Sequence, residues 1–123
     1  MLPTISPDGK LIAAGYLDEQ QIPHLAIIPS LGGQPTKILP WSSSVFPGVG
    51  LGWTPDSSTV VFMQKRSGVS NIWSQPINGD PPKQLTNFKS DLIFRFALSA
   101  DGLNFVLARG TQSRDVVLIR DFR

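Results

Sequence analysis

ISPDGKLIAAGY, residues 5–16, predicts a tight turn followed by an apolar strand, and the pattern returns twice in the 123-residue chain. The later copies are WTPDSSTVVFMQ at 53–64 and LSADGLNFVLAR at 98–109. A second block recurs in step with the first: LAIIPSLGGQPTKIL at 25–39, and IWSQPINGDPPKQLT at 72–86. The chain is therefore about two and two-thirds copies of one unit of roughly 46 residues.

The turn explains why the copies agree at fixed positions. In the first copy, proline presets the backbone for the second turn position, aspartate tolerates the third, and glycine accepts the positive φ that follows. Ser57 replaces this glycine in the second copy and Ala100 replaces the proline in the third, at little expected cost. Because the carboxylates occupy equivalent turns of different units, we expect turn chemistry from them and neither metal binding nor acid–base catalysis. The predicted structural turn residues are Asp8, Gly9, Asp56, Asp101 and Gly102.

Each unit is predicted to hold four short antiparallel strands, because apolar and β-branched runs alternate with glycine- and proline-containing turns. Four-stranded sheets repeating at this period are typical of β-propeller blades, whereas a sandwich or an up-and-down barrel shows no such repetition. The predicted fold class is all-β, a single partial β-propeller domain over 1–123, with blade units at about 1–40, 41–87 and 88–123. Within the units, the first strand is expected at 49–54 and 92–99, and the second at 11–16, 59–64 and 104–109. The third strand is expected at 24–29, 71–76 and 115–120, and the fourth at 36–39 and 83–86.

Composition and charge exclude several classes. The chain has no cysteine, so it has no disulfide, thiolate metal site or cysteine nucleophile. Its net charge is −2 over residues 1–61 and +4 over 62–123, but the basic residues are scattered among strand patterns, so we expect no nucleic-acid partner. No apolar run approaches the roughly 20 residues that span a bilayer, so we expect no membrane contact by this segment. No signal peptide is recognisable, and the compartment stays open.

No catalytic, cofactor or metal site is predicted. His24 is the only histidine, and with neither cysteines nor convergent carboxylates it is expected to be a loop or surface residue. GVGLGW at 48–53 is followed by a turn where a phosphate-binding loop needs a helix, so its glycines are expected to suit a crowded inner strand. The serines at 42–44 lack a nucleophile elbow and are interpreted as a linker. Trp41, Trp53 and Trp73 are expected to pack between blades, with exposure in the loop at 40–48 as the alternative for Trp41.

Any binding surface is expected at the loops around the mouths of the propeller channel. The predicted loops lie at 17–23, 40–48, 65–70 and 89–91. Arg95 interrupts the inner strand LIFRFAL, so it is a candidate to face the channel. A salt bridge from Arg95 to a neighbouring blade is the alternative role.

The motif S/T-P-D-G/S, a β-branched strand and then NIWSQPINGDPPKQLT resembles the repeats of TolB-like propellers and the propellers of prolyl-oligopeptidase-type peptidases. LSADGLNFVLARGTQSRDVVLIRDFR is also similar to the end of the C-terminal propeller of bacterial receptor-type serine/threonine kinases. The resemblance implies a noncatalytic sensor or scaffold module for protein or ligand recognition, with no cofactor. The alternative that it implies is a fragment of the gating propeller of a serine peptidase. A TolB-like or kinase parent would place the module in the periplasm or outside the cytoplasm.

Closing the ring requires more blades than the repeats provide, because a propeller usually has four to eight. Two completions are expected. In the first, two copies join head to tail around a two-fold axis as a six-bladed homodimer. In the second, the missing blades belong to a longer chain. A protein or peptide is the expected external partner.

Overall fold

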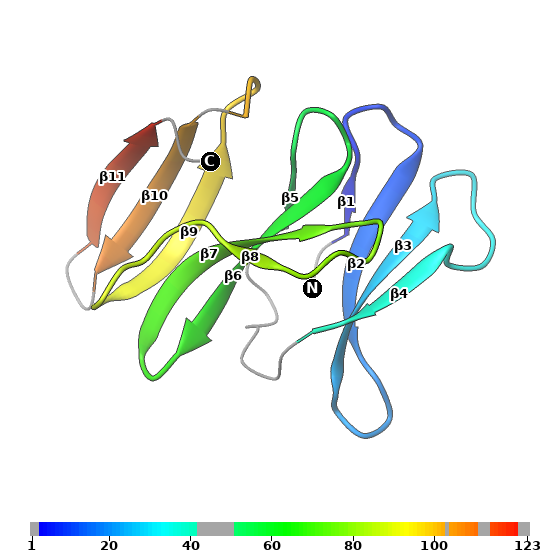
Figure 1. Ribbon diagram of the computed structural model, residues 1–123, viewed down its shortest axis with the longest axis horizontal. Coiled ribbons are helices and arrows are strands. Elements are labelled where there is room, and N and C mark those ends of the chain that lie inside the picture. Colours follow the sequence, from blue (N-terminus) through cyan, green and yellow to red (C-terminus); the bar gives the residue numbers. More distant parts are fainter. Residues whose placement is uncertain (1–2, 42–50, 103, 111–113, 121–123) are drawn as a thin grey trace.

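The computed structural model describes residues 3–41, 51–102 and 104–110, and the backbone of 114–120. Its regular structure is entirely antiparallel β, as the sequence predicts, and it forms three separate sheets (Figure 1). The described residues contain no helix capable of crossing a bilayer.

Each sheet is a meander in which strands that follow one another in sequence lie side by side. Sheet 1 contains β1 (Thr4–Ile5), β2 (Leu11–Leu17), β3 (Pro23–Pro29) and β4 (Lys37–Pro40). Sheet 2 contains β5 (Gly52–Trp53), β6 (Thr59–Arg66), β7 (Val69–Pro76) and β8 (Lys83–Gln84). Sheet 3 contains β9 (Leu92–Leu98), β10 (Asn104–Gly110) and β11 (Arg114–Arg120).

Two strands of sheet 2 are shorter than expected. Residues 42–50, which include the predicted linker serines and the first two residues of the predicted strand at 49–54, lie outside the described residues. Of the four described residues of that strand, only Gly52–Trp53 form β5. The strand predicted at 83–86 ends at Gln84, because the Thr86 hydroxyl replaces the next ladder partner. Ile72 N donates to Thr86 Oγ1 at 2.9 Å, while Leu85 N and Thr86 N both donate to Ile72 O.

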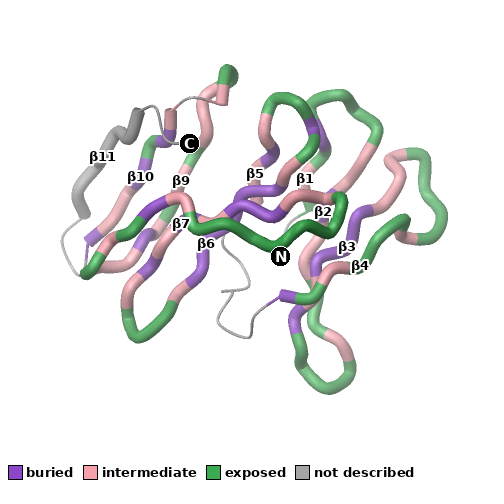
Figure 2. Tube along the Cα trace, viewed as in Figure 1, coloured by how far each residue is buried: buried purple, intermediate pink, exposed green. Residues whose placement is uncertain are grey.

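The middle sheet is buried on both faces, which explains the unbroken apolar run in β6. Val60 and Phe62 point toward sheet 1, where they pack with Leu25 and Ile27. The intervening side chains point toward sheet 3, because successive residues of a strand face opposite sides. Figure 2 shows the resulting buried stretches on β6 and β7.

Tryptophans fill the contact between sheets 1 and 2, as expected. Trp41 and Trp53 belong to its buried core, and Trp73 packs against that core. The rings of Trp41 and Phe62 lie 5.2 Å apart. The core between sheets 2 and 3 is formed by Val61, Met63 and Ile72 of sheet 2 and Ile93, Phe105 and Leu107 of sheet 3.

The first strands of the three sheets follow one another along one side of the molecule. β1 contacts β5, and β5 contacts β9 (Figure 1). Trp53 Nε1 donates a hydrogen bond of 3.1 Å to Thr4 O and so joins sheet 2 to β1. The sheets therefore stack face to face, and their first strands, β1, β5 and β9, lie next to one another along the stack.

Candidate binding sites

The turn between the first two strands has the same hydrogen bonds in every sheet. Gly9 N, Ser57 N and Gly102 N each donate to the carbonyl oxygen three residues earlier, at 2.9 Å. Next to each turn, a hydroxyl donates to the turn carboxylate. The pairs are Ser6 with Asp8, Thr54 with Asp56, and Ser99 with Asp101.

These turns also touch one another across the sheets. Asp8 N donates to Ser57 Oγ at 3.2 Å, joining the turns of sheets 1 and 2. Pro55 lies so close to Gly102 that a Cβ there would stand 2.7 Å from Pro55 Cδ. Ser57 has φ +61°, in the left-handed region that glycine normally occupies. The sequence identified Ser57 only as a departure from the repeat and gave no sign of its contact with Asp8.

Two of the turn carboxylates, Asp8 and Asp56, have a lowered pKa, which favours their charged form. The Ser6 hydroxyl, followed by Lys10 N, lowers the pKa of Asp8. The Thr54 hydroxyl, followed by the hydroxyl and amide of Ser58, lowers the pKa of Asp56. Among the described residues, no three His, Cys, Asp or Glu side chains gather where a metal ion could bind.

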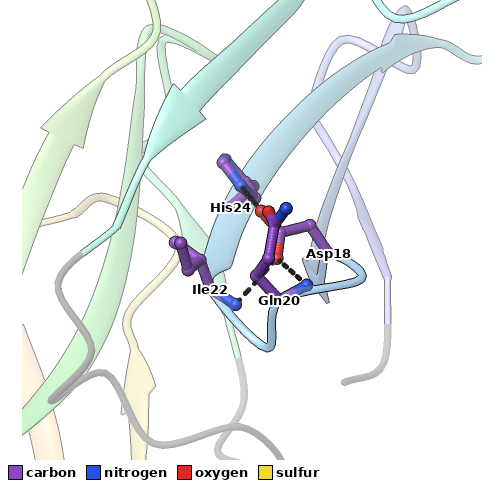
Figure 3. Close-up of polar contacts among 4 residues, drawn as sticks. All are labelled: Asp18, Gln20, Ile22 and His24. Atoms are coloured by element: carbon purple, nitrogen blue, oxygen red, sulfur yellow. Dashed lines mark hydrogen bonds and ion pairs between the residues drawn. The ribbon is translucent and has the colours of Figure 1, made fainter.

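A polar corner closes the β2–β3 hairpin (Figure 3). Asp18 accepts hydrogen bonds from Gln20 N at 2.8 Å and Ile22 N at 2.9 Å, and it pairs with His24 Nε2 at 2.9 Å. The Ile22 amide and then His24 lower the pKa of Asp18. His24 lies in β3, within the strand predicted at 24–29, and its half-buried ring stacks on Tyr16 with ring centroids 5.3 Å apart.

Arg95 lies on β9 opposite Ala108, immediately before a register shift in the β9–β10 ladder. Its side chain is exposed on the face of sheet 3 that points away from sheet 2. The ion pairs found between described residues are Asp18 with His24 and Asp91 with Arg109, so neither contains Arg95. Its channel-facing role stays a prediction.

A groove of about 280 Å³ lies beside the end of the β6–β7 hairpin. Residues from two of the predicted binding loops, 65–70 and 89–91, contribute to its lining. The groove is lined chiefly by Gln64, Arg66, Asn71, Trp73, Phe88 and Lys89. Aromatic, amide and cationic groups therefore share one concave surface.

Asn71 fixes one wall of this groove. Its Oδ1 accepts hydrogen bonds from Phe88 N at 2.6 Å and Thr86 Oγ1 at 2.8 Å, while its Nδ2 donates to Phe88 O at 3.3 Å. The Arg109 guanidinium lies 3.8 Å from the centroid of the Phe88 ring. The segment after β8 is thus held by a side chain of β7 and a cation of β10.

The groove is positively charged. Arg66 is exposed, and its side chain forms no hydrogen bond or ion pair with another described residue; Lys89 is also exposed. No described Asp or Glu lines the groove. The amide and aromatic lining residues lie in strand patterns, so the sequence alone did not reveal that they meet.

No protein-family profile matches the chain, and no curated protein sequence matches it. Solved structures do match its fold. TolB from Acinetobacter baumannii superposes with a TM-score of 0.71 at 24% identity, covering 97% of this chain and 29% of TolB. The chain folds as part of a β-propeller. Because the sequence identity is only 24%, the comparison shows a shared fold and does not show a shared function.

Two further structures agree. A putative TolB from Agrobacterium tumefaciens superposes with a TM-score of 0.69 at 24% identity, covering 94% of this chain and 40% of that protein. A prolyl endopeptidase superposes with a TM-score of 0.71 at 19% identity, covering all of this chain and 21% of the enzyme. The chain thus spans well under half the length of each of these proteins. The expected TolB-like propeller fold is confirmed, and these three structures do not bear on the resemblance to kinase-associated propellers.

Proposed function

We propose that this chain is a noncatalytic β-propeller module that recognises a protein or peptide, and that the groove beside the β6–β7 hairpin is its contact site. The groove is the observation that carries the proposal, because it combines the half-buried indole of Trp73 with two exposed cations and several amides. Recognition sites in proteins typically join an apolar lining to a few placed polar groups.

The charge of the groove selects its ligand. Arg66 offers a planar guanidinium that can hold a carboxylate through two hydrogen bonds, and Lys89 adds a second positive charge. The volume of about 280 Å³ lies just below the usual range for whole small molecules, about 300 to 1,000 Å³. A short peptide segment that carries a Glu or Asp next to an apolar side chain fits both properties.

The test is a titration of the ¹⁵N-labelled chain with an acetylated, amidated pentapeptide of sequence Gly-Leu-Glu-Leu-Gly. We expect amide shifts at Arg66, Asn71 and Gln84, and weaker binding when Gln replaces the Glu of the peptide. Arg66→Gln should weaken binding roughly tenfold, as expected for loss of a hydrogen bond to a charged group.

Lys83→Gln is the matched control, since Lys83 is exposed on β8 but does not line the groove. The same affinity in both protein variants, or equal binding of the Glu and Gln peptides, would contradict the proposed site.

The alternative function is a piece of the propeller that gates a prolyl-oligopeptidase-type serine peptidase. The likeness to a prolyl endopeptidase over the whole of this chain favours it. Sequencing the gene on both sides separates the alternatives. A downstream Gly-x-Ser-x-Gly motif would support the peptidase, whereas an upstream kinase domain would support the sensor of a receptor-type kinase and a site outside the cytoplasm.

A further inference from the structure

The outer face of sheet 1, which points away from sheet 2, is largely apolar, and no other described strand packs on it. Ile12 lies opposite both Ile5 and Ile28 in the strand register, and Ala26 lies opposite Ile38. Ile5 is 57% exposed and Ile38 is 52% exposed. We call this surface face N; its described members are Ile5, Ile12, Ala14, Tyr16, His24, Ala26, Ile28, Ile38 and Pro40.

No other described strand packs on the outer face of sheet 3, which points away from sheet 2. Val106 lies opposite Ala97 and is 46% exposed. Arg95 lies opposite Ala108 on the same face. We call this surface face C; its described members are Arg95, Ala97, Val106 and Ala108.

The internal repeat shows which surface of sheet 2 is equivalent to each face. When Asp8 is aligned with Asp56, Ile12 falls on Val60 and Ala14 on Phe62. Val60 and Phe62 are the residues by which sheet 2 packs on sheet 1. Face N is therefore equivalent to the surface that receives a preceding blade.

Face C has the complementary equivalence. When Asp101 is aligned with Asp56, Val106 falls on Val61 and Ala108 on Met63. Val61 and Met63 are the residues by which sheet 2 packs on sheet 3. Face C is therefore equivalent to the surface that receives a following blade, and it complements face N.

The charges of the two faces agree with this pairing. Arg95 gives face C an exposed positive charge. Asp18 stands at the edge of face N, where it pairs with His24 beside Tyr16. Pairing face C with a second face C would bring two Arg95 charges together, so the charge of face C favours the head-to-tail orientation.

We infer that face C of one copy packs against face N of a second copy, and that the reciprocal contact closes a six-bladed ring around a two-fold axis. This inference deepens the proposed module by naming a second copy as the partner that completes it. It rests on the propeller fold and does not depend on the peptide groove. Six blades lie within the usual range of about four to eight.

One substitution in each face tests the contact. Val106→Glu in face C and Ile38→Glu in face N each place a carboxylate at the junction, so each should raise the dissociation constant of the dimer at least a hundredfold, or about 2.7 kcal/mol. Leu31→Glu is the control, because Leu31 is 100% exposed and lies in the β3–β4 turn, outside both faces. We expect Leu31→Glu to keep the mass of the dimer.

Mixing the two face variants identifies the orientation. A heterodimer of Val106→Glu and Ile38→Glu keeps one wild-type junction, formed by face N of the first variant and face C of the second. The mixture should therefore sediment as a dimer although each variant alone sediments as a monomer. Recovery of the dimer also shows that both variants are folded.

Three results would overturn the inference: a wild-type monomer, a Val106→Glu variant that remains fully dimeric, or a mixture that stays monomeric. Growth of the assembly beyond two copies would overturn two-fold closure. The peptide titration distinguishes these failures from failure of the proposed function. If the protein is a monomer that binds the acidic peptide, only the proposed dimer is contradicted. If it is a dimer that does not bind the peptide, only the proposed binding groove is contradicted.

Discussion

Ser57 occupies the left-handed turn position that is glycine (Gly9 and Gly102) in the other sheets. We attribute the tolerance of serine at this position to its hydroxyl. The hydroxyl accepts the hydrogen bond from Asp8 N that joins two turns. We predict that Ser57→Ala lowers the free energy of unfolding by about 1 kcal/mol, the usual contribution of one hydrogen bond. Ser57→Gly should lower the free energy of unfolding by less, because glycine removes the strain of a left-handed residue, about 1 kcal/mol, and this offsets the lost hydrogen bond. Urea denaturation of the two variants measures the difference, and a larger loss for Ser57→Gly would contradict this explanation.

Gly9 and Gly102 form a matched pair for the contact between turns. Both have φ +75°, so an alanine is equally strained at either position. A Cβ at Gly9 meets nothing within 4 Å, whereas one at Gly102 meets Pro55 at 2.7 Å. We predict that Gly102→Ala lowers the free energy of unfolding by about 1 to 3 kcal/mol more than Gly9→Ala, the usual cost of overpacking. Equal urea midpoints would show that the turns of sheets 2 and 3 do not touch.

The turn carboxylates make stability depend on pH in acid. Hydroxyl and amide donors lower the folded-state pKa of Asp8 and Asp56 below the ordinary value. The unfolded chain therefore binds more protons, so this stabilisation is complete above about pH 5 and is lost as the pH falls through the folded-state pKa values. We predict that the double variant Asp8→Asn, Asp56→Asn flattens the decline of the urea midpoint between pH 5 and 2. An unchanged decline would assign the acid sensitivity to other groups.

At this scale the sequence predicted local chemistry and missed long-range contacts. Proline, aspartate and glycine have strong local backbone preferences, so the repeated motif was enough to predict where the turns lie. The bond from Asp8 to Ser57 and the contact of Pro55 with Gly102 join residues of different sheets. Such contacts depend on how sheets stack, which local preference does not specify.

Among the elements, β6 shows why the strands were predictable. Its alternating side chains serve two cores, so an unbroken apolar run indicates a strand buried on both faces. β8 was predicted too long, because the ends of edge strands depend on individual side-chain bonds such as that of Thr86. The groove was predicted only in part: the loops at 65–70 and 89–91 were expected to bind, but no motif joins them to the lining residues Asn71, Trp73 and Phe88.

The segment after β8 depends on one side chain of β7. Asn71 forms hydrogen bonds with both Phe88 N and Phe88 O. We predict that Asn71→Ala lowers the free energy of unfolding by about 2 kcal/mol, since more than one hydrogen bond is lost. It should also speed hydrogen exchange at the Phe88 amide, while exchange at the Ala26 amide in sheet 1 follows only the change in global stability. Unchanged protection of Phe88 would contradict the role of Asn71 as the anchor of this wall.

For the whole molecule, the internal repeat was enough to predict the propeller architecture but gave no information on function. The positions that repeat are those that build turns and inter-sheet cores, and different proteins use the same fold for different activities. TolB and a prolyl endopeptidase both contain this arrangement of sheets. Function must therefore come from features that do not repeat, such as the groove of sheet 2 and the charge of Arg95 on face C.

If two copies complete one ring, the mass of the protein in solution shows it. Light scattering of the purified chain over a range of concentrations should give twice the chain mass of 13.4 kDa, without further growth at high concentration. A folded chain that remains at 13.4 kDa throughout that range would contradict the account.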